Sequence, residues 1–149
     1  MPNRALVVDA NILVRAVLGK RVRAVMEAHA ENVSFFIPEV AYCEAEEHLA
    51  ALAVKRGGEP YQALALLRSL GRLLELVGDE VYGDFEAEAR ERLEMRDQDD
   101  WPILAAALAL GCPIWTEDSD FFGCGVATWT SNRVKVFLRE AGLREGGAE

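Results

Sequence analysis

The feature that most constrains the fold is an alternation of short apolar segments with longer segments of helical periodicity. The first apolar segment, ALVV at residues 5–8, has no polar side chain and is expected to be buried on both faces. Strands of this kind, separated by helices, form a parallel sheet with helices on both sides. We therefore expect an α/β fold, a three-layer α/β/α sandwich around a short, mostly parallel central sheet of about five strands. The expected strands are residues 5–8, 33–37, 73–77, 112–116 and 126–130.

Helical periodicity and end signals predict the helices between these strands. The clearest helix is DWPILAAALALG, in which Asp100 is the expected N-cap, Pro102 lies in the first turn and Gly111 ends the helix. The segment 84–96 is predicted to be amphipathic, and its glutamate–arginine pairs four residues apart stabilise an exposed helix. The other expected helices cover residues 11–18, 21–31, 38–56, 61–70 and 131–142.

The chain of 149 residues, 51% of them hydrophobic, is large and apolar enough to form one folded domain. We expect this domain to cover residues 1–142 and a flexible tail to follow at 143–149. No apolar run is long enough to cross a bilayer and the first residues lack a signal-peptide pattern, so we expect a cytoplasmic protein with no membrane partner. The three cysteines, without CxxC spacing, are expected to be reduced and packed in the core.

Acidic residues follow two of the expected strands. Asp9, with Asn11 two residues later, directly follows the strand at 5–8. Asp118 and Asp120 follow the strand that ends in Thr116. Side chains just past the carboxyl ends of parallel strands line the functional crevice of such folds. Each position also has a plainer explanation, since Asp9 can cap a helix and the Asp118 segment can form a turn.

Two further acidic positions lie on expected helices. Asp100 can cap its helix and still present one oxygen to a ligand. The helix at 38–56 offers several glutamates, of which Glu44 is the principal candidate and Glu47 its competitor. Glu47 competes because it belongs to the expected inward face of that helix. This face consists of Val40, Cys43, Glu47 and Ala51.

Several carboxylates brought together at one edge of a sheet repel one another. Two unit charges about 4 Å apart cost about 4 kcal/mol at an effective dielectric constant near 20. Such a cluster is stable when it is protonated or holds a cation, and carboxylate oxygens are preferred ligands of Mg²⁺ and Mn²⁺. The acidic positions therefore predict a magnesium or manganese site that cleaves a phosphodiester.

The charge of the chain is unevenly distributed. The net charge of −9 argues against a protein that coats nucleic acid with a basic surface. Residues 77–100 contain ten acidic residues and three arginines. Residues 10–26 contain no acidic residue and provide a candidate RNA-binding surface. Its basic members are Arg15, Lys20, Arg21 and Arg23.

Three segments, in this order, resemble the PIN-domain family. VVDANIL at 7–13 resembles its first-strand aspartate motif, and IPEVAYCEAEEHL at 37–49 resembles its glutamate helix. DDWPILAAALALGCPIWTEDSDFF at 99–122 resembles its aspartate–helix–strand–aspartate segment and is the most specific of the three. The resemblance extends over about residues 4–138 and implies the same α/β/α fold.

The resemblance implies a ribonuclease that uses Mg²⁺ or Mn²⁺ and that, in many small bacterial members, is a toxin paired with an antitoxin protein. Asn11 and Thr116 match polar residues that assist the family's site. Attack by water would leave 5′-phosphate and 3′-hydroxyl ends on the RNA. The implied catalytic residues are Asp9, Glu44, Asp100 and Asp118. The implied metal ligands are Asp9, Asp100, Asp118 and Asp120.

Particular residues separate this function from others. A phosphatase with an aspartyl nucleophile would have a second aspartate two residues after the first, where this chain has Asn11. A receiver domain would have an adjacent acidic pair near the first strand. The main alternative is a catalytically inactive PIN-like module that binds RNA or a protein. A second copy of the chain is a further expected partner, because a homodimer would lengthen a basic groove built from residues 15–23.

Overall fold

The computed structural model describes residues 4–139, and the five strands in this part of the chain form one parallel sheet. The strand order is β3-β2-β1-β4-β5, so the chain begins in the middle of the sheet and builds outwards on each side in turn. This sheet confirms the predicted α/β fold class. The strands are β1 (Arg4–Val8), β2 (Val33–Pro38), β3 (Leu74–Val77), β4 (Ile114–Trp115) and β5 (Thr128–Trp129).

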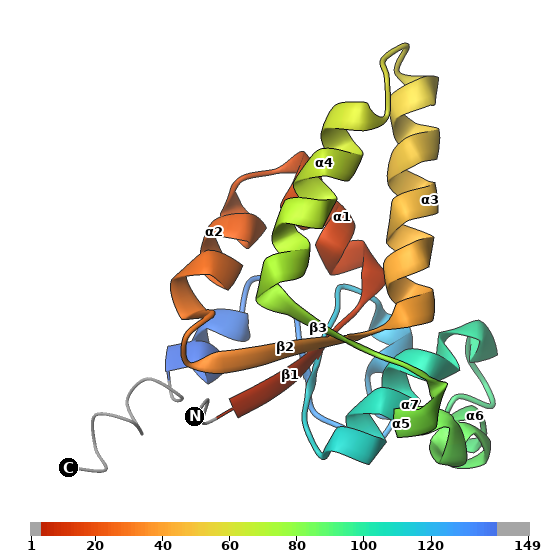
Figure 1. Cartoon of the computed structure of the whole chain (residues 1–149). Coiled ribbons are helices and arrows are strands. Elements are labelled where there is room, and N and C mark those ends of the chain that lie inside the picture. Colours follow the sequence, from red (N-terminus) through yellow and green to blue (C-terminus); the bar gives the residue numbers. More distant parts are fainter. Residues whose placement is uncertain (1–3, 140–149) are drawn as a thin grey trace.

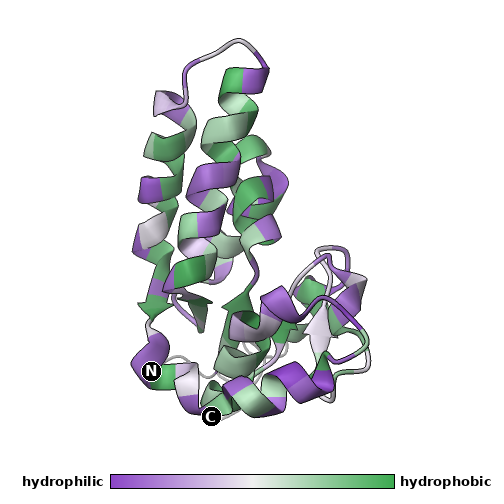
Figure 2. Cartoon of the chain, turned by 90° about the vertical axis from the view of Figure 1, so that its right-hand side faces the viewer, coloured by the Kyte–Doolittle hydropathy of each residue, from purple (hydrophilic) through white to green (hydrophobic). Residues whose placement is uncertain are grey.

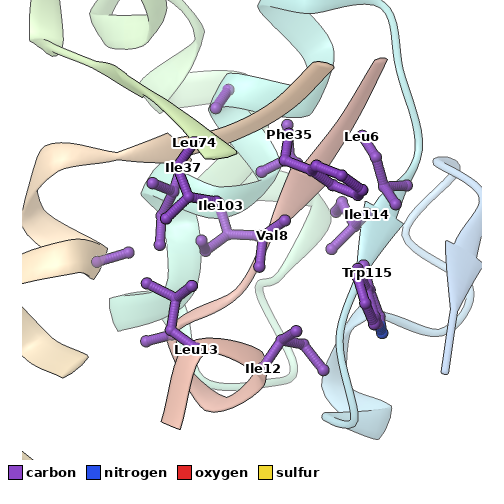
Figure 3. Packing of buried hydrophobic residues seen from close by; sticks show 14 of the residues in the cluster. Leu6, Val8, Ile12, Leu13, Phe35, Ile37, Leu74, Ile103, Ile114 and Trp115 are labelled. Atoms are coloured by element: carbon purple, nitrogen blue, oxygen red, sulfur yellow. The ribbon is translucent and has the colours of Figure 1, made fainter. Parts of the chain in front are cut away.

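The central strand β1 is buried because it has a neighbouring strand on each side and helices on each face. Val7 is aligned with Phe36 of β2 and with Ile114 of β4. Figure 3 shows Leu6 and Val8 among other buried side chains of the core. Leu6, Val7 and Val8 of the segment that lacks polar side chains are fully buried, as predicted, whereas Ala5 is partly exposed.

Two groups of helices cover the two faces of the sheet (Figure 1). On one face α1 contacts α2, α3 and α4, and on the other α7 packs against β1, β2 and β4 and contacts α5 and α6. The helices are α1 (Ala10–Leu18), α2 (Arg21–His29), α3 (Glu39–Lys55), α4 (Tyr61–Leu70), α5 (Asp79–Tyr82), α6 (Glu86–Arg92) and α7 (Trp101–Leu110). Single 3₁₀ turns lie at Gly71–Leu73, Gly83–Phe85, Gln98–Asp100 and Ser119–Phe121.

Helices α3 and α4 form a hairpin that extends away from the sheet (Figure 2). The predicted inward face of α3 was wrong, because Val40 is 54% exposed and Cys43, Glu47 and Ala51 are exposed as well. The alanines that form most of the true inward face carry a weak hydrophobic signal, but their small side chains let α3 lie close to α1. The buried residues of α3 are spaced four apart: Ala41, Ala45 and Leu49.

The acidic segment after β3 is more broken than predicted. The one helix predicted over 84–96 is replaced by a 3₁₀ turn at Gly83–Phe85 and the shorter α6. The short helix α5 precedes them. The predicted ion pairs on α6 are confirmed, with nitrogen–oxygen distances of 2.7 Å for Arg90–Glu86 and 2.9 Å for Arg92–Glu88. The breaks allow the segment to bury three side chains against the domain. These are Tyr82, Ala89 and Leu93.

Three smaller predictions concern the cysteines, membranes and the end of the chain. All three cysteines are free; Cys112 and Cys124 are buried as predicted, whereas Cys43 is exposed, so the core prediction was wrong for Cys43. No helix among residues 4–139 combines the length and hydropathy needed to cross a membrane. Residues 134–139 of the predicted last helix are helical, and the predicted tail at 143–149 lies outside the described residues.

The inward face of α3 leads to a stability prediction. Leu49 is 1% exposed, so we expect Leu49→Ala to lower the free energy of unfolding by about 2–4 kcal/mol, because it leaves a cavity in the core. Val54 on the same helix is 66% exposed, and Val54→Ala should change stability by less than about 0.5 kcal/mol. Urea denaturation of both variants measures the difference; equal losses would contradict the assigned face.

Candidate metal centre

Four acidic residues from separate elements lie around the carboxyl ends of β1 and β4. Asp9 directly follows β1, Asp118 follows β4, Asp100 precedes α7, and Glu44 lies in the second turn of α3. Because β1 and β4 are paired neighbours, their ends are adjacent, and the Asp9 amide donates to the Trp115 carbonyl at 3.0 Å. The topology therefore gathers at one rim residues that are far apart in the sequence.

The Asp9 carboxylate accepts three hydrogen bonds from neutral donors. Its Oδ1 accepts from the Ala10 amide at 2.8 Å, which makes Asp9 the N-cap of α1. Its Oδ2 accepts from the Thr116 hydroxyl at 2.7 Å and from the Asn11 side-chain amide at 3.1 Å. Asp9 is 5% exposed. Asp9 thus caps a helix and is also fixed at the rim, so the two explanations offered by the sequence are compatible.

Thr116 and Asn11 link the segment after β1 to the segment after β4. The Thr116 hydroxyl oxygen accepts from the Asp118 amide at 2.9 Å while it donates to Asp9. The Asn11 carbonyl oxygen accepts from the Glu117 amide at 3.3 Å, and its Nδ2 donates to Thr116 at 3.4 Å. These two residues therefore position Asp9 and Asp118 relative to each other.

Three carboxylates converge beside Asp9. One carboxylate oxygen from each of Asp100, Asp118 and Asp120 lies within 4.8 Å of the others. Asp100 occupies the N-cap position of α7, as predicted, but in the described structure its side chain makes no capping hydrogen bond. Asp118 Oδ1 accepts from the Asp120 amide at 2.9 Å, which fixes the turn that carries both. The Asp100 carboxylate is thus not used to cap α7 and interacts instead with Asp118.

Burial, together with the crowding of these carboxylates, raises two pKa values. Burial is the main cause that raises the pKa of Asp9 to about 6, and the charges of Asp118 and Glu44 add to it. Burial also raises the pKa of Asp100 to about 7, with further contributions from the charges of Asp9, Asp118 and Asp97. The rim therefore holds more negative charge than its surroundings stabilise, and a bound cation would relieve this.

The donor set fits a hard divalent cation. The converging ligand atoms are all carboxylate oxygens, which suit Mg²⁺ and Mn²⁺ better than the softer metals that prefer sulfur or imidazole. Asp100, Asp118 and Asp120 are the converging residues whose oxygens would suit such an ion, and Asp9 lies beside them.

The register of α3 favours Glu44 over Glu47 as the glutamate of the site. With Ala41 and Ala45 facing inward, Glu44 lies close enough to Asp9 for its charge to contribute to the raised pKa of Asp9. Among the described residues, Glu44 and not Glu47 lines the two cavities beside the carboxylates. Glu44 is outside the group of three converging carboxylates, so its position suits a group that orients water or substrate.

Two cavities of different character flank Glu44. The first, of about 410 Å³, lies between α1 and α3 and is lined by Asn11, Arg15 and His48 as well as Glu44. The second, of about 330 Å³, includes Asp9 and Asp100 and extends to α5 and the start of α7. One side of Glu44 thus carries Arg15, and the other side is acidic and aromatic.

The four predicted RNA-binding residues are not gathered at one place. Arg15 lines the first cavity, beside the carboxylates. Lys20 and Arg21 are exposed where α1 meets α2. Arg23 lies 3.9 Å from Glu27 and lines a separate cavity with Arg72. Arg15 is therefore the predicted cation that the fold brings nearest to the candidate site.

Sequence reasoning missed two arginines that hold the loop after β4. Arg96 donates to the backbone carbonyls of Asp120, at 2.7 Å, and of Phe122. Arg92 donates to the Cys124 carbonyl at 3.0 Å. These three bonds join the segment around α6 to the loop that carries Asp118 and Asp120. From the sequence, Arg92 is predicted only as one partner of a helix-surface ion pair with Glu88.

The same loop contains a detectable signal for this contact. Gly123 and Gly125 have φ angles of 85° and 91°, a region that side chains rarely adopt. A Cβ atom at Gly125 would also clash with the guanidinium of Arg92. Two glycines so close together after a strand therefore indicate a loop whose backbone is approached closely by side chains from elsewhere in the fold.

A family model described as the PIN domain matches residues 7–139. The chain belongs to the PIN domain family. None of the curated proteins matches it. The expected resemblance is thus confirmed over nearly the whole chain.

Solved structures with the same fold have distant sequences. A chain in the crystal structure of VapBC2 from Rickettsia felis bound to a DNA fragment from their promoter is 17% identical, with a TM-score of 0.67 over 85% of this PIN domain chain and 98% of that chain. PAE2754 from Pyrobaculum aerophilum is 18% identical, with a TM-score of 0.68 over 93% and 90%. A chain of FitAcB from Neisseria gonorrhoeae is 19% identical, with a TM-score of 0.63 over 85% and 97%.

The raised pKa values predict that the metal-free PIN domain loses stability as pH rises. Asp9 and Asp100, with pKa values of about 6 and 7, hold their protons more tightly in the folded protein than in the unfolded chain. Between roughly pH 4 and pH 7 the unfolded chain therefore releases these protons first, and the free energy of unfolding falls. We expect the Tm in EDTA to be roughly 5 °C lower at pH 8 than at pH 5, and Mn²⁺ to restore it at pH 8.

The Asp9→Asn variant separates this effect from the titration of other groups. It should show a smaller fall in Tm between pH 5 and pH 8 and a smaller gain from Mn²⁺. Asp84→Asn, which changes an exposed acid outside the centre, should behave like the original protein. A Tm in EDTA that rises from pH 5 to pH 8 would contradict the shared-charge explanation.

The arginine contacts predict an effect on metal affinity. Arg96→Met keeps the apolar stem but removes the donors to Asp120 and Phe122, so the loop should become less ordered and the Kd for Mn²⁺ should rise roughly tenfold. Arg90→Met is the control, because Arg90 pairs with Glu86 on α6. Isothermal titration with Mn²⁺ measures both; equal affinities would mean that Arg96 does not position the loop.

Proposed function

We propose that this PIN domain is a divalent-metal-dependent endoribonuclease that hydrolyses RNA phosphodiester bonds. The observation that carries the proposal is the convergence of Asp100, Asp118 and Asp120 within 4.8 Å beside the buried Asp9. A protein gains nothing in stability from placing unpaired carboxylates so close together. A cation-dependent function explains why the chain carries them.

Each residue of the rim has a role in this proposal. Asp9, Asp100, Asp118 and Asp120 hold Mg²⁺ or Mn²⁺, and Glu44 orients the attacking water. A divalent ion bound there neutralises the phosphate and activates water. Thr116 and Asn11 keep the Asp9 carboxylate in one orientation through their hydrogen bonds. Attack by water leaves a 5′-phosphate on one RNA product and a 3′-hydroxyl on the other.

The first cavity supplies the contact for the RNA backbone. Arg15 lines the same cavity as Glu44. Its guanidinium can therefore pair with a phosphate next to the one that is cleaved. Lys20 and Arg21, which are exposed beyond it, extend the positive charge along α1 and α2. The backbone is thus held from the α1 side of the rim.

An antitoxin protein is the proposed regulatory partner. One similar chain comes from a toxin–antitoxin complex of Klebsiella pneumoniae, with 19% identity and a TM-score of 0.62. We propose that a partner protein also binds this chain and that its binding controls access to the acidic rim. Co-purification with the product of a neighbouring gene tests this.

Cleavage of end-labelled single-stranded and hairpin RNAs tests the nuclease. We expect cleavage with Mn²⁺, none with EDTA, and a loss of at least roughly 100-fold in Asp9→Asn and Asp118→Asn, because loss of a metal ligand costs more than loss of an outer partner. The products should carry 5′-phosphate and 3′-hydroxyl ends.

Two results would count against this function. Cleavage that persists in EDTA, or products with 2′,3′-cyclic phosphate ends, would exclude attack by water at the acidic rim. Binding of RNA without cleavage, unchanged in Asp9→Asn, would instead favour the catalytically inactive module. Asp84→Asn, which retains the rim, should cleave as the original protein does.

A further inference from the structure

The second cavity extends beyond the carboxylates and is built differently from the first. Its volume is about 330 Å³, and its far end is formed by α3, α5 and the start of α7. Val40, Tyr82 and Trp101 give it apolar walls, and Asp79 and Asp99 supply carboxylates. It therefore combines a flat apolar surface with hydrogen-bond acceptors, next to the atoms proposed to hold the cleaved phosphate.

The walls of this cavity are fixed by packing. Tyr82 is 3% exposed, and its ring lies 5.6 Å from that of Trp101 at an angle of 60°. The guanidinium of Arg90 lies 5.4 Å from the centre of the Trp101 ring and is itself bound to Glu86. A cavity with walls held in this way is formed before a ligand binds.

Val40 is an apolar side chain that is largely exposed to water. It is 54% exposed near the start of α3 and lines the cavity together with Trp101 of α7. A flat ligand in the cavity would contact both side chains. An apolar residue in this position therefore suits the face of a planar ring.

The charge at the far end of the cavity disfavours a phosphate there. Residues 77–100, which supply Asp79 and Asp99, contain ten acidic residues and three arginines. Like charges at close range repel. These carboxylates repel the phosphates of RNA. They can, in contrast, accept hydrogen bonds from the N–H groups of a base.

We propose that this cavity binds the base of a nucleotide adjoining the cleaved phosphate and prefers a base with an exocyclic amino group. The proposal rests on the proposed ribonuclease function and adds a specificity to it. Asp79 is the principal acceptor, with Asp99 beside it. Ionised carboxylates only accept hydrogen bonds, so they pair with the amino group of cytosine, adenine or guanine. Uracil presents a carbonyl oxygen where cytosine presents its amino group and is disfavoured.

Binding of two mononucleotides tests this without any turnover. Cytidine and uridine 5′-monophosphate differ at the amino group in question, and their Kd values with Mg²⁺ can be measured by ¹⁵N NMR at the Trp101 indole. We expect cytidine 5′-monophosphate to bind at least roughly tenfold more tightly, which is the lower end of the range for a hydrogen bond to a charged group. Asp79→Asn should bring this ratio close to one, because its amide can also donate to uracil.

The control and a second variant keep the test independent of folding. Asp84→Asn removes an exposed acid of the same segment that does not line the cavity, and it should keep the preference for cytosine. Val40→Arg changes an exposed position, so the fold should tolerate it; its long side chain should fill the cavity and abolish the preference while Mg²⁺ still binds.

Sequencing of product ends from a randomised RNA connects the cavity to cleavage. We expect uracil to be depleted at one position beside the cut, and the depletion to disappear in Asp79→Asn. Cleavage with equal base frequencies, together with equal Kd values, would overturn the base site and leave the nuclease intact. No cleavage, with an Asp79-dependent preference for the cytidine nucleotide, would support the base site and reject the nuclease.

A protein ligand is the remaining outcome. If an arginine-rich peptide binds with a dependence on Asp79 while the two nucleotides bind equally, the cavity takes a basic protein segment and the proposal is overturned.

Discussion

The hydrogen bond between the Thr116 hydroxyl and the Asp9 carboxylate is the interaction on which the rim depends. β1 and β4 are aligned over only two residue pairs, Val7–Ile114 and Val8–Trp115. Hydrogen bonds between side chains just past the strand ends therefore add to the contact between the two strands. Thr116 donates to Asp9 and accepts from the Asp118 amide, and thereby joins two acidic segments across the sheet. Without this hydroxyl, a 5%-exposed carboxylate would lose a strong donor, and burial of a charge without such partners is costly.

The sequence predicted the fold and most of the rim because both follow from strand ends. A strand without polar side chains is buried, and the residue after it reaches the rim, which is enough to place Asp9 and Asp118. The inward face of α3 was not predictable in the same way, because Ala41 and Ala45 pack through their small size and carry little hydrophobic signal. The bonds of Arg96 to backbone carbonyls depend on the path of a loop; Gly123 and Gly125 mark this loop in the sequence but do not identify the arginine that binds it.

The two sides of the rim differ in charge, and this difference gives the site a direction. Arg15 lies on the α1 side, and Asp79 and Asp99 lie on the side of α5 and α7. A polyanion is attracted to the first side and repelled from the second, so a strand of nucleic acid that crosses the rim is not free to run either way. The net charge of −9 is therefore compatible with an RNA substrate, because the acidic residues are concentrated where no phosphate needs to lie.

The shortness of the outermost strands has a consequence for how other proteins can recognise this domain. The edge strand β5 has two residues and β3 has four, with Glu75 and Leu76 of β3 exposed. An added strand from another chain would find few backbone groups to pair with at either edge, and short edges of this kind also resist aggregation. Recognition among the described residues is thus left to helix surfaces and loops, whose side chains can diverge between related domains while the sheet stays the same.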